Sequence, residues 1–298
     1  MFPSPAIKSQ LIRERLPALM EKLDPCRLCP RLCLSHRSQG ETGECRIGDT
    51  VLISTIGLHR GEEFPISGLY GSGTIFLSGC NLHCVFCQNW TISQSADGAP
   101  CKARDLARAM LTLQRSGAHN INWVSPTHVL PMLLDALQLA YEDGLGIPLV
   151  YNTGGYDNVE VIELLDGIVD IYMPDMKYGD SETAKMFSDV DDYVTYNQRI
   201  VQEMYRQVGP LVLDQIGAAT RGLLVRHLVL PNNLANSDAI FRFLDESLPG
   251  YVDINIMDQY RPCHQAYRFP ALQRRIMDEE YQRALELARS KPSLRIIE

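Results

Sequence analysis

The stretch Gly79-Cys80-Asn81-Leu82-His83-Cys84-Val85-Phe86-Cys87-Gln88-Asn89 holds three cysteines with the spacing Cys-x3-Cys-x2-Cys. It directly follows Thr74–Ser78, a run with the composition of a buried strand. Three thiolates this close can bind three irons of a [4Fe–4S] cluster and leave the fourth iron free to hold a substrate. The alternative is a zinc loop in which His83 is the fourth ligand. Because His83 lies inside a very tight loop, the open iron–sulfur interpretation is favoured.

Outward from this loop, strand-like and helix-like segments alternate along the chain. This alternation predicts a parallel sheet with crossover helices. Six such units suit a partial barrel better than a closed barrel of eight, so the predicted fold is α/β, a partial (β/α)6 barrel of the TIM type. The predicted strands are Thr74–Ser78, Ile121–Val124, Pro148–Tyr151, Ile168–Met173, Leu223–Leu230 and Val252–Met257, with a short one near Leu294–Ile297. The predicted helices are Lys102–Ser116, Thr127–Asp143, Asn158–Leu165, Ser181–Ser188, Asp191–Val208, Ala235–Ser247 and Ala271–Arg289.

Ahead of the predicted barrel lies a second cysteine group. Residues 7–23 have a helical apolar period that Pro17 interrupts. Four cysteines follow with the spacing Cys-x2-Cys-x3-Cys-x11-Cys: Cys26, Cys29, Cys33 and Cys45. Four thiolates can complete the ligand set of an iron–sulfur cluster or of a tetrahedral zinc ion. Spacing leaves both open. A second cluster is favoured because the same chain must already be loaded with one.

Composition excludes several classes of protein. The chain has 298 residues, 45% of them hydrophobic and 21% charged, which is typical of a globular protein. Its net charge of −8 argues against a general nucleic-acid binder. No apolar run approaches a membrane span, and the first residues lack the pattern of a secretory signal. We therefore expect a cytoplasmic protein, in which nine cysteines indicate metal binding more than disulfides.

Three parts of the chain are predicted from these patterns. Residues 1–70 form an N-terminal Cys-rich segment, residues 71–260 form the partial barrel, and residues 261–298 form a C-terminal extension.

The cysteine loop resembles that of the radical S-adenosylmethionine (radical SAM) superfamily. The matching residues are Cys80, Cys84 and Cys87, with the aromatic Phe86 just before the last cysteine. The resemblance implies a [4Fe–4S] cluster whose open iron binds the amino and carboxylate groups of SAM, and it places Phe86 at the cofactors. It also implies that an electron from the cluster splits SAM into methionine and a 5′-deoxyadenosyl radical.

Within that superfamily, the chain is most similar to the glycyl-radical-enzyme activating enzymes, such as the pyruvate formate-lyase activating enzyme, in a branch with an extra N-terminal cysteine segment. The similar stretches are Cys87-Gln88-Asn89, Asn152-Thr153-Gly154-Gly155, Met173-Pro174-Asp175-Met176-Lys177 and Arg226-His227-Leu228-Val229-Leu230-Pro231. They span about residues 74–260, occur in the family's order and follow or end predicted strands.

Two departures from that family's pattern shape the predicted SAM pocket. Val124-Ser125-Pro126-Thr127-His128 stands where the family has Gly-Gly-Glu, so no acid is present to receive the SAM amino group. Asn152 stands where the family has aspartate. The predicted cofactor-binding residues are Phe86, Ser125, Thr127, Asn152, Thr153, Asp175, Lys177 and Arg226. No catalytic residue is predicted.

The expected function is radical SAM chemistry, that is, reductive cleavage of SAM followed by abstraction of a hydrogen atom from a substrate. The resemblance implies an oxidoreductase that activates another enzyme, with a protein substrate and an electron donor such as a flavodoxin or ferredoxin. One alternative is radical modification of a small molecule or peptide. Another, from a different class, is an iron–sulfur electron carrier, which the missing fourth cysteine near Cys80–Cys87 disfavours. A third is a zinc-stapled interaction protein.

Overall fold

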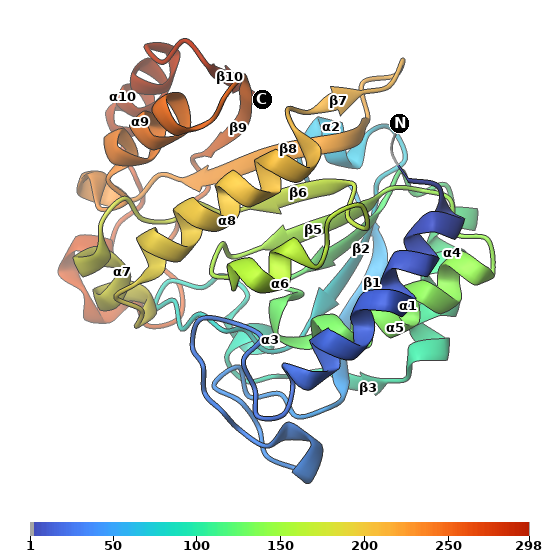
Figure 1. Cartoon of the computed structure of the whole chain (residues 1–298). Helices are drawn as coiled ribbons and strands as arrows, with labels where there is room; N and C mark the ends of the chain where they lie inside the picture. Colours follow the sequence, from blue (N-terminus) through green and yellow to red (C-terminus); the bar gives the residue numbers. More distant parts are fainter. Residues whose placement is uncertain (1–2, 298) are drawn as a thin grey trace.

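The structure, a computed structural model, describes residues 3–297, which build one curved sheet flanked by helices (Figure 1). Within that range ten strands pair in the order β10-β9-β8-β6-β5-β4-β2-β1-β3, and β7 pairs with β8. All pairs from β2 to β10 along this order are parallel, whereas β1 and β3 add an antiparallel edge. The strands are β1 (Val51–His59), β2 (Ser72–Leu77), β3 (Ala99–Cys101), β4 (Ile121–Val124), β5 (Leu149–Thr153), β6 (Ile171–Pro174), β7 (Val212–Leu213), β8 (Ala219–Leu228), β9 (Val252–Met257) and β10 (Leu294–Ile296).

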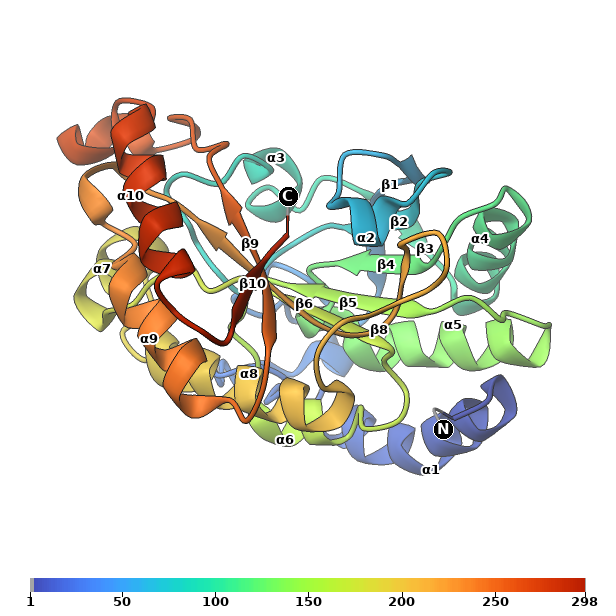
Figure 2. The same ribbon diagram turned by 90° about the horizontal axis from the view of Figure 1, so that it is seen from above.

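Most helices cover the convex side of the sheet, where α5, α6, α8 and α9 lie in a row (Figure 2). Their apolar faces pack on strands that are buried on both sides, as parallel strands require. The helices are α1 (Pro5–Glu21), α2 (Phe64–Ser67), α3 (Trp90–Ser93), α4 (Ala103–Arg115), α5 (Leu130–Glu142), α6 (Val159–Glu163), α7 (Ser181–Ser188), α8 (Tyr193–Val208), α9 (Ser237–Ser247) and α10 (Asp278–Arg289). This arrangement confirms the predicted α/β partial barrel.

Most predicted helices end within about three residues of the observed bounds, and two predictions need a fuller correction. The helix α1 runs through Pro17, because its buried side chains Ile12 and Leu19 pack on α5 and outweigh the lost hydrogen bond. The last helix begins at Asp278 and not at Ala271. Residues before it form two 3-10 turns, and the carboxylate of Glu280 accepts the backbone N–H of Met277, which sets the start of α10.

The connection between β1 and β2 folds onto the concave side of the sheet, where Figure 2 shows α2. Ile66 of α2 is fully buried there and clusters with Val150, Ile171 and Leu224 of β5, β6 and β8. The side-chain amide of Asn120 donates to the Ile66 carbonyl (2.8 Å). The α2 connection therefore fills part of the barrel interior.

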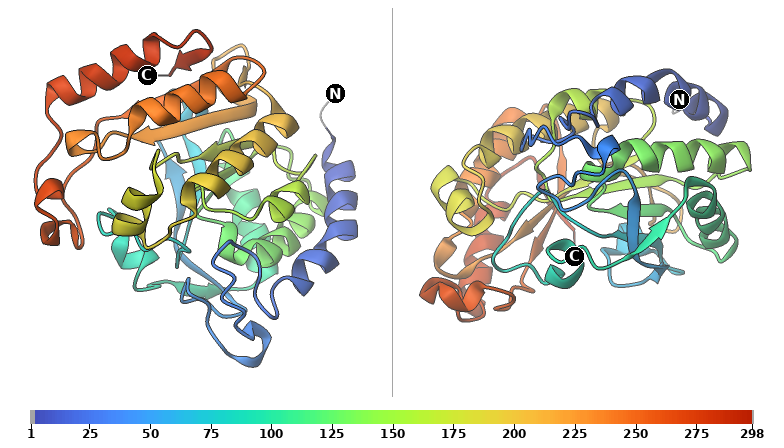
Figure 3. Two further views of the ribbon diagram at one scale, coloured as in Figure 1. Left: turned by 60° about the vertical axis from the view of Figure 1, so that its left-hand side comes forward. Right: turned by 90° about the horizontal axis from the view of Figure 1, so that it is seen from below.

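Residues 22–50 run mostly as turns and irregular chain, with one 3-10 turn at Arg37–Gln39, and they lie beside the cysteine loop (Figure 3). Lys8 of α1 makes a buried 2.5 Å ion pair with Asp170, which ties the start of the chain to the barrel. The division of the chain at residues 70 and 260 stays a prediction. No helix within residues 3–297 is both long and apolar enough to span a membrane.

Candidate functional site

The three-cysteine loop starts at the carboxyl end of β2 with Gly79, whose φ is +82°. Each sulfur has a hydrogen-bonding partner. The Leu82 N–H donates to Sγ of Cys80 (3.4 Å), and the Ser188 hydroxyl donates to Sγ of Cys84 (2.9 Å). Sγ of Cys87 lies 3.2 Å from the Ser93 hydroxyl. Donors aimed at sulfur favour its anionic form, which is the form that binds metal.

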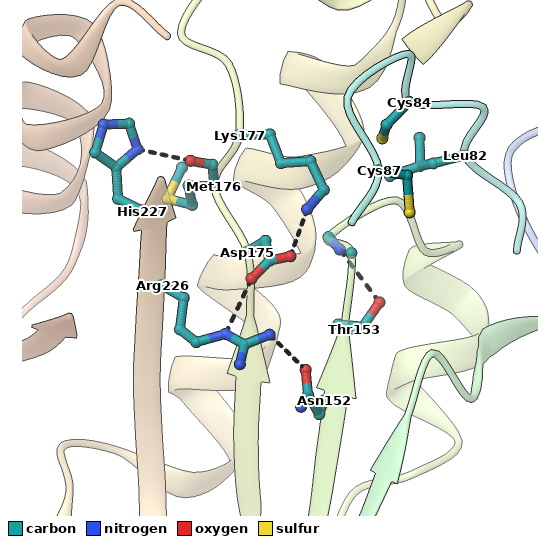
Figure 4. Close-up of polar contacts among 12 residues, drawn as sticks. Leu82, Cys84, Cys87, Asn152, Thr153, Asp175, Met176, Lys177, Arg226 and His227 are labelled. Carbon is teal, nitrogen blue, oxygen red and sulfur yellow. Dashed lines mark hydrogen bonds and ion pairs between the residues drawn. The ribbon is translucent and has the colours of Figure 1, made fainter. Parts of the chain in front are cut away.

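A buried polar network lies at the carboxyl ends of β5, β6 and β8 (Figure 4). Nε of Arg226 lies 3.0 Å from Oδ1 of Asp175, and one Nη of Arg226 donates to Oδ1 of Asn152 (2.9 Å). The other Asp175 oxygen pairs with Nζ of Lys177. Thus Asp175, Lys177 and Arg226 form one connected network of ion pairs.

Charge in this network is set by burial and by ion pairing. Burial raises the pKa of Asp175, but Lys177 and Arg226 outweigh it and leave the pKa lowered. Burial lowers the pKa of Lys177, but Asp175 and Cys84 outweigh it and leave the pKa raised. Lys177 is therefore a cation close to the cysteine loop. Burial raises the pKa of the Cys80 thiol to about 12, and Lys177 opposes that rise.

The predicted residues on β4 and β5 are organised by an aspartate that sequence reasoning missed. The fully buried carboxyl of Asp157 accepts hydroxyl hydrogen bonds from Thr127 (2.6 Å), Thr153 (2.6 Å) and Tyr151 (2.8 Å). Ser125 lies at the end of β4 in a left-handed conformation (φ +59°), and its N–H donates to the Asn152 carbonyl (2.8 Å). Ser125, Thr127, Asn152 and Thr153 therefore do lie together.

Phe86 is placed in an aromatic cluster. Its ring makes edge contacts with Tyr260 and Tyr178, with ring centroids 5.9 and 6.3 Å away. All three side chains are buried, so they exclude water from one flank of the cysteine loop.

The N-terminal cysteines also lie together. A Cβ placed on Gly43 would be 3.3 Å from the sulfurs of both Cys33 and Cys45. Burial raises the pKa of the Cys29 thiol, and the charges of Cys45 and Cys26 add to the rise. The four cysteines thus lie near one another in the N-terminal segment, and a metal centre there stays a prediction.

A buried arginine accompanies this quartet. Arg37 is fully buried, and its guanidinium donates to the carbonyls of Gly48 (2.8 Å) and His128 (2.7 Å) and to Sγ of Cys26 (3.7 Å). Within residues 3–297 it forms no ion pair with a carboxylate. A buried cation needs a compensating charge. The neighbouring thiols can supply it only as thiolates.

The two cysteine groups are joined by direct contacts. Arg31 donates to the carbonyls of Asn81 (2.9 Å) and Asp189 (2.8 Å), and His83 contacts the Glu44 carbonyl (3.1 Å) through Nε2. Oδ1 of Asn81 lies 4.0 Å from Sγ of Cys80, and the Asn81 side chain opposes the rise in the pKa of the Cys29 thiol. His83 therefore faces the N-terminal segment, and Asn81 separates the groups.

Both groups suit iron–sulfur clusters in donor chemistry. The loop at 80–87 supplies three thiols of one type, each with a hydrogen-bonding partner and with a cation beside them. The quartet supplies four. Across residues 3–297, no group of three or more His, Cys, Asp or Glu side chains is arranged to hold a metal ion as it stands. The support for a metal at either group is thus donor type, burial and charge.

Sequence reasoning also missed Glu62 and Glu63, which precede α2. Glu62 lies 3.3 Å from Arg226, and Glu63 accepts a hydrogen bond from Asn255 (2.7 Å). The one available signal was a pair of acids directly before the apolar run at 64–66 in a turn-rich stretch. No motif or periodicity singled out Asn81, Arg37 or Asp157, and each of them contacts at least one residue 30 or more positions away along the chain.

Comparison with known proteins agrees with this site. A family model described as the Radical SAM superfamily matches residues 74–203. The chain is 36% identical over 274 residues to the uncharacterized protein MJ0674 of Methanocaldococcus jannaschii, a match that covers 88% of this chain and 74% of that protein. It is 27% identical over 165 residues to MJ0808 of the same organism, which covers 49% of this chain and 48% of that one.

Among solved structures, HydG, a maturase of the [FeFe]-hydrogenase, is similar in fold. The TM-score is 0.51 at 14% identity, over 75% of this chain and 50% of HydG. The chain therefore spans about half the length of HydG and of MJ0808. At this identity the likeness to HydG concerns the fold alone.

Proposed function

Because the chain belongs to the radical SAM superfamily, we propose that it cleaves SAM reductively and abstracts a hydrogen atom from a substrate held in the barrel. Cys80, Cys84 and Cys87 hold the cluster. When bound, a reduced [4Fe–4S] cluster supplies the electron that splits SAM into methionine and the 5′-deoxyadenosyl radical. The observation that carries this proposal is the three-thiol loop with Lys177 beside it, at the carboxyl ends of the parallel strands.

In this proposal the side chains of the protein orient polar groups at the SAM pocket, balance the charge of the thiolates and shield the cysteine loop from water. Asp157 fixes the hydroxyls of Thr127 and Thr153, which present polar atoms at the ends of β4 and β5. Arg226 fixes Asn152 through a 2.9 Å hydrogen bond. Lys177 offsets the negative charge of the thiolates. The aromatic cluster around Phe86 keeps water from the loop.

We propose a glycine of a partner enzyme as the substrate, so that this chain is an activating enzyme of the glycyl-radical type. The resemblance of the four stretches given above supports this. The alternative substrate is a small molecule or peptide. The electron comes from a reduced flavodoxin or ferredoxin in the cytoplasm.

We further propose that the quartet Cys26, Cys29, Cys33 and Cys45 holds a second metal centre. The buried Arg37 supports it, because thiolates bound to a metal would balance this cation. A [4Fe–4S] cluster is favoured over zinc. The contact of Asn81 with both cysteine groups suits transfer of an electron between two clusters.

The proposal is tested by anaerobic incubation of the reconstituted protein with SAM and dithionite. Wild type should form 5′-deoxyadenosine, and Cys80→Ala, Cys84→Ala and Cys87→Ala should each abolish it. Cys263→Ala is the matched control, because Cys263 belongs to neither group. Turnover near wild type in any loop variant would refute the assignment. A glycyl radical seen on a candidate partner enzyme would identify the activase; product on a small molecule would identify the alternative.

Metal analysis tests the quartet. With two clusters, wild type should carry roughly eight irons per chain and Cys29→Ala roughly four. With zinc, iron should stay near four in both and about one zinc should be lost from the variant. Four alkylatable thiols in anaerobic wild type would refute a centre of either kind.

A further inference from the structure

Two adjacent acids, Glu62 and Glu63, enter the barrel interior from the connection between β1 and β2. One oxygen of Glu62 pairs with Arg226 (3.3 Å), and the other accepts from the side-chain amide of Asn122 on β4 (3.4 Å). Oε1 of Glu63 accepts from Asn255 on β9 (2.7 Å). Residues from β4, β8 and β9 therefore converge on the two acids.

In the part of the chain that the structure describes, two acceptor atoms of this group have no hydrogen-bonding partner. Glu63 is 8% exposed, and its Oε2 has no hydrogen-bonding partner within the described residues. Asn122 is fully buried, and its Oδ1 is likewise without a partner there. Buried acceptors that lack a donor are costly, so they indicate that a donor is missing from this place.

Charge identifies the missing donor as a cation. The connected network holds three carboxylates, on Glu62, Glu63 and Asp175, against two cations, on Arg226 and Lys177. Burial raises the pKa of Glu62, Arg226 opposes the rise and Glu63 adds to it. One more positive charge would balance the group.

The pair borders the proposed SAM site, because Glu62 contacts Arg226, one of the predicted cofactor-binding residues. A chain of contacts runs from Cys84 through Lys177, Asp175 and Arg226 to Glu62, so the acids lie at its far end from the cysteine loop. The Arg226 side chain is 17% exposed although it points to the interior, so solvent reaches this network.

We propose that Glu62 and Glu63 are substrate-binding residues that take a cationic nitrogen with at least two N–H bonds, as in a primary ammonium or a guanidinium group. Glu63 Oε2 and Asn122 Oδ1 accept its hydrogens, and the two carboxylates balance its charge. This inference rests on the proposed function in that it assigns the barrel interior to the substrate.

The test compares n-butylammonium with neutral n-butanol as probes of the anaerobically reconstituted full chain with SAM bound. Dissociation constants are measured by ligand-observed NMR for wild type, Glu63→Gln and the control Glu279→Gln, an exposed acid of α10. Wild type and control should prefer butylammonium by about tenfold or more, and Glu63→Gln should lose that preference. An equal affinity of wild type for both probes, or a preference kept in Glu63→Gln, would overturn the inference.

Two further measurements keep the test decisive. Crystals of wild type soaked in butylammonium should show the amine at Oε2 of Glu63; a water that persists there would overturn the inference, even if the variant fails to fold. SAM affinity that falls as much as amine affinity in Glu63→Gln would also overturn it, because the pair would then bind the ammonium of SAM. Failure of wild type to form 5′-deoxyadenosine would refute the proposed function alone and leave the binding result standing.

Discussion

The guanidinium of Arg37 lies 3.7 Å from Sγ of Cys26, and Arg37 is fully buried. Its other hydrogen bonds go to backbone carbonyls. A cation in this position stabilises the segment only when thiolates balance it, and thiols become thiolates when they bind metal. We therefore expect that metal binding by the quartet stabilises the buried Arg37, and that Arg37 in turn favours metal binding.

Arg37→Gln should reduce the metal held by the quartet by at least about half, because the thiolates lose their buried counter-charge. Arg27→Gln, at an exposed position between Cys26 and Cys29, is the matched control. Iron and zinc per chain are measured after anaerobic purification. Equal metal content in the two variants would contradict the role given to Arg37.

Gly79→Ala should force the three-cysteine loop away from the segment that carries Cys45, and should destabilise the fold. A Cβ at Gly79 would lie 2.5 Å from Cγ1 of Ile47 and 2.6 Å from the Cys45 carbonyl oxygen, at a φ of +82°. We expect a loss of about 2 kcal/mol or more in the free energy of unfolding. Gly144→Ala is the control, because it shares a positive φ but meets nothing within 4 Å. Equal losses in denaturant unfolding would mean that the close packing is unimportant.

Asp157→Asn should weaken SAM binding and destabilise the barrel. The amide nitrogen cannot accept, so one of the hydroxyls of Thr127, Thr153 and Tyr151 loses its acceptor. The expected cost is about 1–3 kcal/mol of unfolding free energy. SAM affinity and denaturant unfolding are measured beside Asp191→Asn, an exposed control. Wild-type SAM affinity in the folded variant would show that Asp157 does not position the pocket.

Lys177→Gln should lower the reduction potential of the cluster at the loop. A cation near Cys84 favours the added electron, so its removal disfavours reduction. The expected shift is on the order of tens of millivolts. It is measured by a redox titration followed by electron paramagnetic resonance, with Lys185→Gln as the exposed control. A potential unchanged or raised in Lys177→Gln would count against this effect.

Acid should destabilise the fold through His227. Burial lowers its pKa to about 4, and the hydrogen bond to the Met176 carbonyl opposes this. The unfolded chain protonates the imidazole near pH 6.5, so it binds more protons than the folded chain between pH 6.5 and 4. The free energy of unfolding should therefore decrease as the pH is lowered from 6.5 to 4. This group contributes at most about 3 kcal/mol to the decrease.

His227→Gln should reduce that dependence and leave the share of His128, whose pKa burial also lowers to about 4. His36→Gln, at an exposed position, should keep the dependence in full. Denaturant unfolding at several pH values between 4 and 7 measures the slopes. Parallel slopes for wild type and His227→Gln would assign the acid sensitivity to other groups.

The fold class and the close spacing of the three loop cysteines follow from the sequence alone. Alternation of strands and helices is a local pattern, and it predicts the parallel sheet with crossover helices that the structure has. The loop at 80–87 brings its thiols together whatever surrounds it, because only a few residues separate them. The predicted residues at the ends of β4, β5, β6 and β8 also lie where carboxyl ends of parallel strands must meet.

The partners of the buried charges depend on the folded structure. Arg226 meets Glu62 across 164 positions of sequence, and Arg37 meets the His128 carbonyl across 91. Sequence periodicity does not predict such pairs, because a buried ion pairs with the opposite charge or dipole that packing of the sheet brings close to it. The same packing placed α2 inside the barrel and left Oε2 of Glu63 without a hydrogen-bonding partner among residues 3–297. Local pattern thus predicts which residues share an edge of the sheet, while the low dielectric of the packed interior determines which of them must pair.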